Sequence, residues 1–96
     1  MVKMKRYMDR NILVELVVKF YFDTGLLDES VLKRGEIKII VDDCLDKPEY
    51  LETIINTIII KAKTHKVTDV EMLKAMLLEL ERIRLELEYK EYNAVS

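Results

Sequence analysis

Three residues in this 96-residue chain strongly favour a break in regular structure: Gly25, Gly35 and Pro48. An all-β fold needs a turn after every short strand, and glycine and proline supply many of those turns. Breaks as sparse as these favour a few long elements instead. The sequence therefore predicts an all-α fold, a bundle of three or four helices, within a single helical domain that spans residues 1–96.

The clearest helical pattern covers residues 69–91. Thr68 followed three residues later by Glu71 forms a capping box, which is a start signal for a helix. We expect a long C-terminal helix of about 34 Å, which exceeds the width of a domain this size, so its end projects or meets a partner. Apolar residues recur in this helix at alternating spacings of three and four, the pattern of a packed seam, at Leu73, Met76, Leu80, Ile83 and Leu87.

Two further helices are predicted upstream. Residues 9–24 are apolar around most of the helix circumference, which is typical of a helix at the centre of a core, and Gly25 suits its end. Residues 47–64 carry Pro48 in the first turn, where its missing N–H costs nothing. Their many β-branched residues lower the helix propensity, so packing must hold this helix. Capping residues are expected at each start: Asp9 or Asn11, and Asp46 with Glu49.

Residues 28–45 fit two structures. Ser30 can cap a short helix, Val31–Arg34, which Gly35 then interrupts. Residues 36–41 alternate in polarity as a short strand does, but they also fit an apolar helical stripe. A strand without a neighbouring strand leaves its backbone N–H and C=O groups unpaired. A helix is therefore favoured here, and the strand stays the alternative.

The composition limits the cellular compartments in which such a chain is expected. Its single cysteine, Cys44, rules out an intrachain disulfide and fits a reducing compartment. Its longest apolar runs have four residues or fewer, far below the roughly 20 that span a bilayer. We therefore expect a cytoplasmic protein with no membrane association. Residues 1–8 are expected to form either a short strand or a flexible basic arm.

No catalytic, cofactor or metal site is expected. The acidic group Asp42, Asp43 and Asp46, which has Cys44 among it, lacks the spacing of a calcium loop and is interpreted as a solvated turn. His65, the only histidine, lies at the basic end of a predicted helix, where it complements the helix dipole. Two isolated glycines cannot build a phosphate-binding loop. The sequence predicts that the chain is not an enzyme.

The final predicted helix carries a second apolar flank, on the side opposite its seam. This flank consists of Leu78, Leu85, Tyr89 and Tyr92. Tyrosine often anchors interfaces because one end of its side chain is apolar and the other tolerates water. We therefore expect a non-enzymatic small regulatory or adaptor protein that acts as a homodimer through helix-mediated protein–protein interaction. The four residues would contact a protein partner or a second copy of the chain.

The alternative function is a dimeric nucleic-acid-binding transcriptional regulator that uses the basic N-terminal arm. Its phosphate-contacting residues would be Lys3, Lys5, Arg6 and Arg10. A net charge of −2 disfavours this function, because nucleic-acid-binding domains usually carry a basic excess.

Overall fold

Four helices account for most of the chain. The computed structural model describes the backbone of residues 6–95 and the side chains of residues 6–92. The helices are α1 (Arg10–Asp23), α2 (Arg34–Cys44), α3 (Pro48–Thr64) and α4 (Val70–Val95), and no strand occurs in this part of the chain. The all-α bundle with a long C-terminal helix is therefore confirmed. Residues 1–5 of the predicted basic arm lie outside the described residues.

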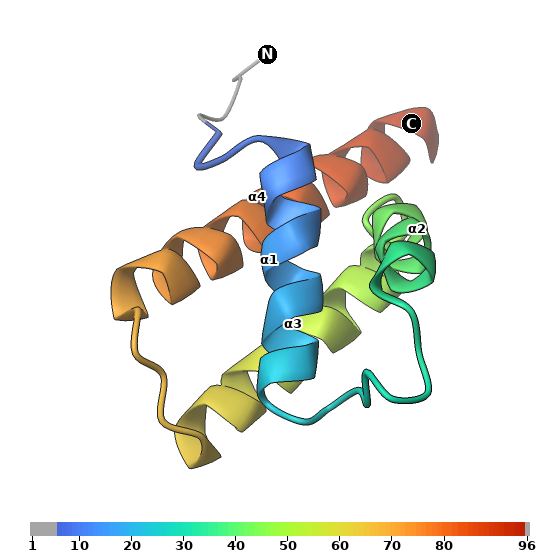
Figure 1. The fold of residues 1–96 in the computed structure, drawn as a ribbon. Helices are drawn as coiled ribbons and strands as arrows, with labels where there is room; N and C mark the ends of the chain where they lie inside the picture. The colour runs from blue at the N-terminus through green and yellow to red at the C-terminus, as the bar shows by residue number, and fades with distance from the viewer. Residues whose placement is uncertain (1–5, 96) are drawn as a thin grey trace.

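The helices form a bundle of crossing pairs rather than a parallel array. In Figure 1, α1 crosses in front of α3 and α4, which pack against each other, while α2 lies at one side. The principal extents of 46 × 27 × 22 Å show that the molecule is elongated, and α4, with 26 residues, is its longest element. Packing joins α1 to α2 and α4, and it joins α3 to α2 and α4.

All four helices contribute to one apolar core. Helix α1 supplies five buried apolar residues within about half of its circumference, and it packs against both α2 and α4. The predicted seam of α4 also forms, since Met76, Leu80 and Ile83 are buried while Leu73 and Leu87 are half-buried. Each fully buried leucine contributes about 2 kcal/mol by removing apolar surface from water. Seven aliphatic residues are essentially inaccessible: Leu13, Val17, Val18, Leu45, Leu51, Ile58 and Leu80.

The helix ends differ from the sequence prediction at three starts. Gly25 ends α1 as predicted, with a φ of 79° that other residues adopt at a cost. Helix α3 begins after Lys47, with no side-chain cap, so the expected cap from Asp46 is wrong. At α4 the cap is Asp69 rather than Thr68, because Asp69 Oδ1 accepts a hydrogen bond from the Met72 N–H at 2.9 Å. Asp9 precedes α1 but makes no side-chain cap bond either.

The ambiguous segment is helical. Helix α2 covers the whole of residues 36–41, so the strand alternative is wrong, as expected for a strand without a partner. The predicted short helix Val31–Arg34 is also wrong. Asp28 Oδ1 instead accepts bonds from the Ser30 N–H at 2.9 Å and the Ser30 hydroxyl at 2.8 Å, which closes a turn. Gly35 does not interrupt α2, because it falls in the first turn.

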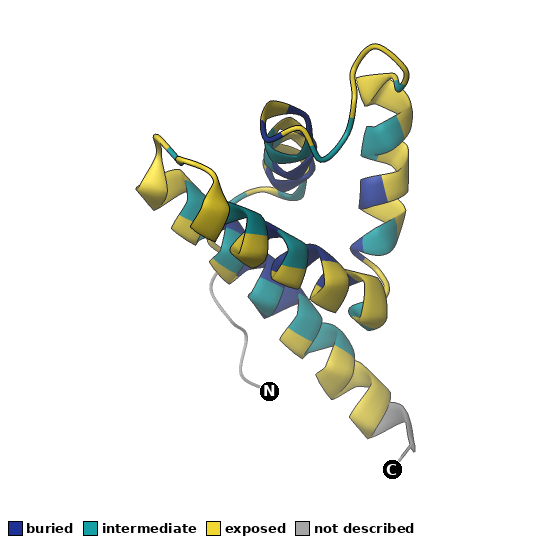
Figure 2. Ribbon diagram, turned by 90° about the horizontal axis from the view of Figure 1, so that it is seen from below, coloured by how far each residue is buried: buried dark blue, intermediate teal, exposed yellow. Residues whose placement is uncertain are grey.

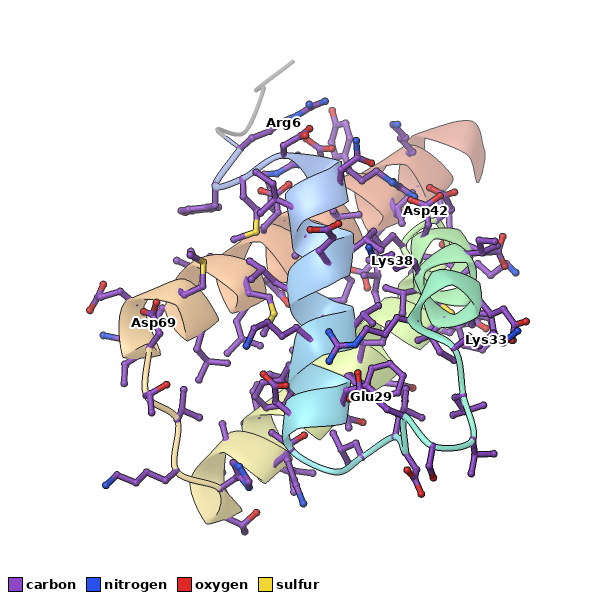
Figure 3. All side chains as sticks on the ribbon, in the orientation of Figure 1. Arg6, Glu29, Lys33, Lys38, Asp42 and Asp69 are labelled. Carbon is purple, nitrogen blue, oxygen red and sulfur yellow. The ribbon has the colours of Figure 1, made fainter. Side chains whose placement is uncertain are left out.

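Helix α2 is the least embedded of the four. Only Val41 of this helix is buried, whereas Ile39 is 73% exposed. Polar contacts tie it to α1, including an ion pair between Lys38 Nζ and Glu15 Oε1 at 2.9 Å. Figure 3 shows Lys38 on the side of α2 that faces α1. Exposed ion pairs of this kind stabilise weakly, so α2 is held mainly by the apolar packing of Val41 and of the half-buried Ile37 and Cys44.

Candidate protein-interaction face on helix α4

The four residues predicted to bind a partner lie on the exposed side of α4. Leu78, Leu85 and Tyr92 are seven residues apart and therefore fall almost in line along the helix, with Tyr89 beside them. Their exposed fractions are 48% for Leu78, 40% for Leu85, 56% for Tyr89 and 76% for Tyr92. We call these four residues the α4 face. It is separate from the buried seam, so α4 is apolar on two sides.

The C-terminal end of α4 extends beyond the rest of the bundle. Ile83 is the last buried residue of this helix among those whose side chains are described, and Leu87 is half-buried. The helix continues to Val95, which adds about 18 Å at 1.5 Å per residue. Figure 2 shows this end reaching away from the other helices with a largely exposed surface. A helical segment without tertiary packing is marginally stable in water, so this end gains most from a contact outside the monomer.

Charged side chains flank the α4 face and form ion pairs with one another. Arg84 forms an ion pair with Glu81 and a second one with Glu88, whose Oε1 lies 2.7 Å from Arg84 Nη1. The hydrogen bond from Arg84 to Glu81 is the main reason that the pKa of Arg84 is raised. Pairs at these spacings stabilise a helix by a few tenths of a kcal/mol each. Because two glutamates surround one arginine, this cluster keeps a net charge of −1 beside the α4 face.

A buried ion pair lies on another side of α4. Arg82 Nη2 lies 2.6 Å from Glu79 Oε2, and the two side chains are only 8% and 2% exposed. Glu79 Oε1 also accepts a hydrogen bond from the Tyr7 N–H at 2.8 Å, which fixes the segment before α1 against α4. Burial by itself would raise the pKa of Glu79, but the bonds from Arg82 and Tyr7 and the charge of Arg82 lower it overall. The spacing of this pair is visible in the sequence, but its burial is not.

The basic residues of the alternative function are only partly described. Lys3 and Lys5 lie outside the described residues, while Arg6 and Arg10 line a polar cavity of about 250 Å³ beside the Glu79–Arg82 pair. Arg10 donates hydrogen bonds to Asp42 Oδ1 at 2.8 Å and to Asp46 Oδ1 at 3.1 Å. The acidic group that we interpreted as a solvated turn thus holds Arg10. Figure 3 shows Asp42 on α2, near the N-terminal end of α1 where Arg6 also lies.

Groups with catalytic or metal-binding potential are scattered. Within residues 6–95 no three His, Cys, Asp or Glu side chains are placed to hold a metal ion together. His65 is exposed just after α3. Burial raises the pKa of the Cys44 thiol, and the charge of Asp43 raises it further, which disfavours the reactive thiolate. No helix of the described chain has the length and apolar character that crossing a membrane requires.

Comparisons with protein families, curated proteins and solved structures find no match to this chain. Function is therefore inferred from the surfaces of the chain itself. The α4 face departs from an ordinary solvated surface, because it lines up large apolar side chains on a helix that extends past its own bundle.

Proposed function

We propose that this protein is a non-enzymatic interaction module, a small regulator or adaptor, whose α4 face binds a second copy of the chain. The observation that carries the proposal is the exposed apolar line on a helix that continues about 18 Å past its last buried residue. A contact along that line would cover the apolar side chains. It would also add packing to the projecting end, whose described side chains after Ile83 are half-buried or exposed.

A second copy fits this face because the spacing of its residues is self-complementary. When two α4 helices run antiparallel with Leu85 at the two-fold axis, Leu78 of each copy lies opposite Tyr92 of the other. The charged residues beside the face then meet the same residues of the second copy. Each Arg84 lies near Glu88 of the second copy but also near the second Arg84, and Glu81 lies nearly level with the second Glu88, so the apolar residues set the register and not the charges.

The size of the α4 face limits how tight this dimer can be. Stable interfaces bury about 800 Å² on each partner. Four side chains that are 40–76% exposed offer on the order of 100 Å² each, which is roughly half of that area. The stems of the flanking charged residues must supply the remainder. We therefore expect a concentration-dependent dimer rather than a permanent one.

The molar mass in solution tests the proposal. At high protein concentration the mass should approach twice the 11.4 kDa of the monomer, measured by sedimentation equilibrium. Leu85→Asp should return it to 11.4 kDa with unchanged helical content, because Leu85 is not part of the core. The matched control is Ile39→Asp on α2, which places the same charge on a more exposed apolar residue and should leave the dimer intact. A wild-type chain that stays monomeric at every concentration, or a Leu85→Asp mass equal to that of the wild type, contradicts the proposal.

The alternative of a dimeric nucleic-acid-binding regulator gains less support from the geometry. Arg10, one of its four cations, is already bonded to Asp42 and Asp46 and is therefore a poor phosphate ligand. Binding through the arm would fall steeply as salt rises and would be lost when Lys3, Lys5 and Arg6 become alanine. Absence of any DNA or RNA shift at low salt would eliminate it.

A further inference from the structure

Both borders of the α4 face carry an excess of negative charge. The first border consists of Arg84 with Glu81 and Glu88, a group whose net charge is −1. The side chains of Glu81 and Glu88 are 39% and 48% exposed, so both carboxylates lie at the surface. The hydrogen bond from Arg84 lowers the pKa of Glu81, which keeps this carboxylate ionised at neutral pH.

The second border contains Arg82 with Glu79 and Glu86, and its net charge is also −1. Glu79 and Arg82 are buried, but the side chain of Glu86 is 39% exposed. Over residues 78–92, five glutamates outnumber three basic residues and give this part of α4 a net charge of −2. The whole chain has the same sign, with a net charge of −2. Two copies therefore repel each other both at the α4 face and as whole molecules.

Pairing through the α4 face brings like charges level with each other. At 3.6 residues per turn, Glu81 and Glu88 lie roughly 40° and 60° to the same side of Leu85. In an antiparallel pair with its two-fold axis at Leu85, this side of one helix meets the same side of the other. Glu81 lies four residues before Leu85 and Glu88 lies three after it. Glu81 of one copy is therefore offset from Glu88 of the other by only about 1.5 Å along the helix.

We propose that ionic strength controls this association, and that salt shifts the chain from monomer to dimer. The proposal rests on the α4 dimer and adds the condition that favours it. At about 10 Å, close to the spacing of packed helices, two single negative charges in water repel enough to raise Kd about twofold. The two borders together raise it about fourfold. The screening length falls from about 30 Å at 0.01 M salt to about 10 Å at 0.1 M, so added salt removes most of this repulsion.

Sedimentation equilibrium of the full chain at pH 7, in dilute and in concentrated sodium chloride, tests the proposal. The Kd of the wild-type dimer should fall about threefold from roughly 0.01 M to roughly 0.3 M salt. A Kd that is unchanged, or that rises with salt, would overturn the proposal while leaving the dimer itself in place. A chain that stays monomeric at every concentration in both buffers would overturn the dimer and its regulation together.

Charge variants separate the first border from the charge of the whole molecule. Glu88→Gln leaves this border neutral, so in the dilute buffer its Kd should be about half the wild-type value. Arg84→Gln doubles the negative charge of the border and should raise Kd about fivefold in the same buffer. The matched control is Glu52→Gln on the exposed side of α3, which changes the net charge of the chain as Glu88→Gln does and should change Kd less. Equal effects of Glu88→Gln and Glu52→Gln, or a tighter dimer for Arg84→Gln, would overturn the proposal.

Discussion

Glu79→Ala should destabilise the monomer far more than loss of a comparable surface charge. The substitution leaves Arg82 buried without its main partner and removes the acceptor of the Tyr7 N–H. Loss of one member of a buried ion pair costs about 3–5 kcal/mol. We expect about 3 kcal/mol, the lower end, because Arg82 keeps its second ion pair to Glu86 at 2.7 Å. For a domain of this size the unfolding temperature should then fall by roughly 15 °C.

The matched control for this prediction is Glu81→Ala on the same helix. Glu81 also pairs with an arginine three residues later, but its side chain is 39% exposed, so its loss should cost at most about 1 kcal/mol. Urea unfolding followed by circular dichroism at pH 7 measures both free energies. Both variants should be compared at one low protein concentration, so that dimerisation does not contribute. Equal destabilisation by the two substitutions would refute the claim that the Glu79–Arg82 pair acts as a buried unit.

Acid pH and substitutions at the two glycines should also change the free energy of unfolding. Because the folded state lowers the pKa of Glu79, the stability from this group is complete above its usual pKa of 4.5 and is lost as the pH falls through the lower folded value. The free energy of unfolding should therefore decline with acid below about pH 4.5, and a Glu79→Gln variant that declines as steeply would exclude this group as the cause. Gly25→Ala should destabilise by about 1 kcal/mol, because alanine is strained at a φ of 79°. Gly35→Ala should stabilise by about 0.5 kcal/mol, since no atom lies within 4 Å of the added Cβ. A Gly35→Ala variant that unfolds at a lower temperature than Gly25→Ala would contradict both predictions.

Local patterns in the sequence were sufficient to predict features that depend on a single helix. The spacing from Leu73 to Leu87 predicted the buried seam of α4, and the same spacing argument placed Leu78 and Leu85 on its exposed side. Gly25 marked the end of α1 because only the local backbone conformation matters there.

The cap predicted at Asp46 failed because of a contact distant in sequence, whereas the predicted helix Val31–Arg34 was replaced by a local turn at Asp28. Asp46 resembles a helix cap, but Arg10, 36 positions away, captures its carboxylate. The sequence does not distinguish Glu79 from the other charged residues of α4, yet packing buries it against Arg82 and the Tyr7 amide. Neither event leaves a trace in the local pattern, since the competing partner becomes close only when the chain folds.

Amide hydrogen exchange in the last turns of α4 tests the dimer proposal most directly, because it reports on the residues that extend past the core. If a second copy covers the α4 face, exchange at residues 88–92 should slow as the protein concentration rises, and Leu85→Asp should abolish that dependence. Exchange at the buried positions around Leu80 should not change between the same samples. Rates at residues 88–92 that are identical at every concentration would contradict the account.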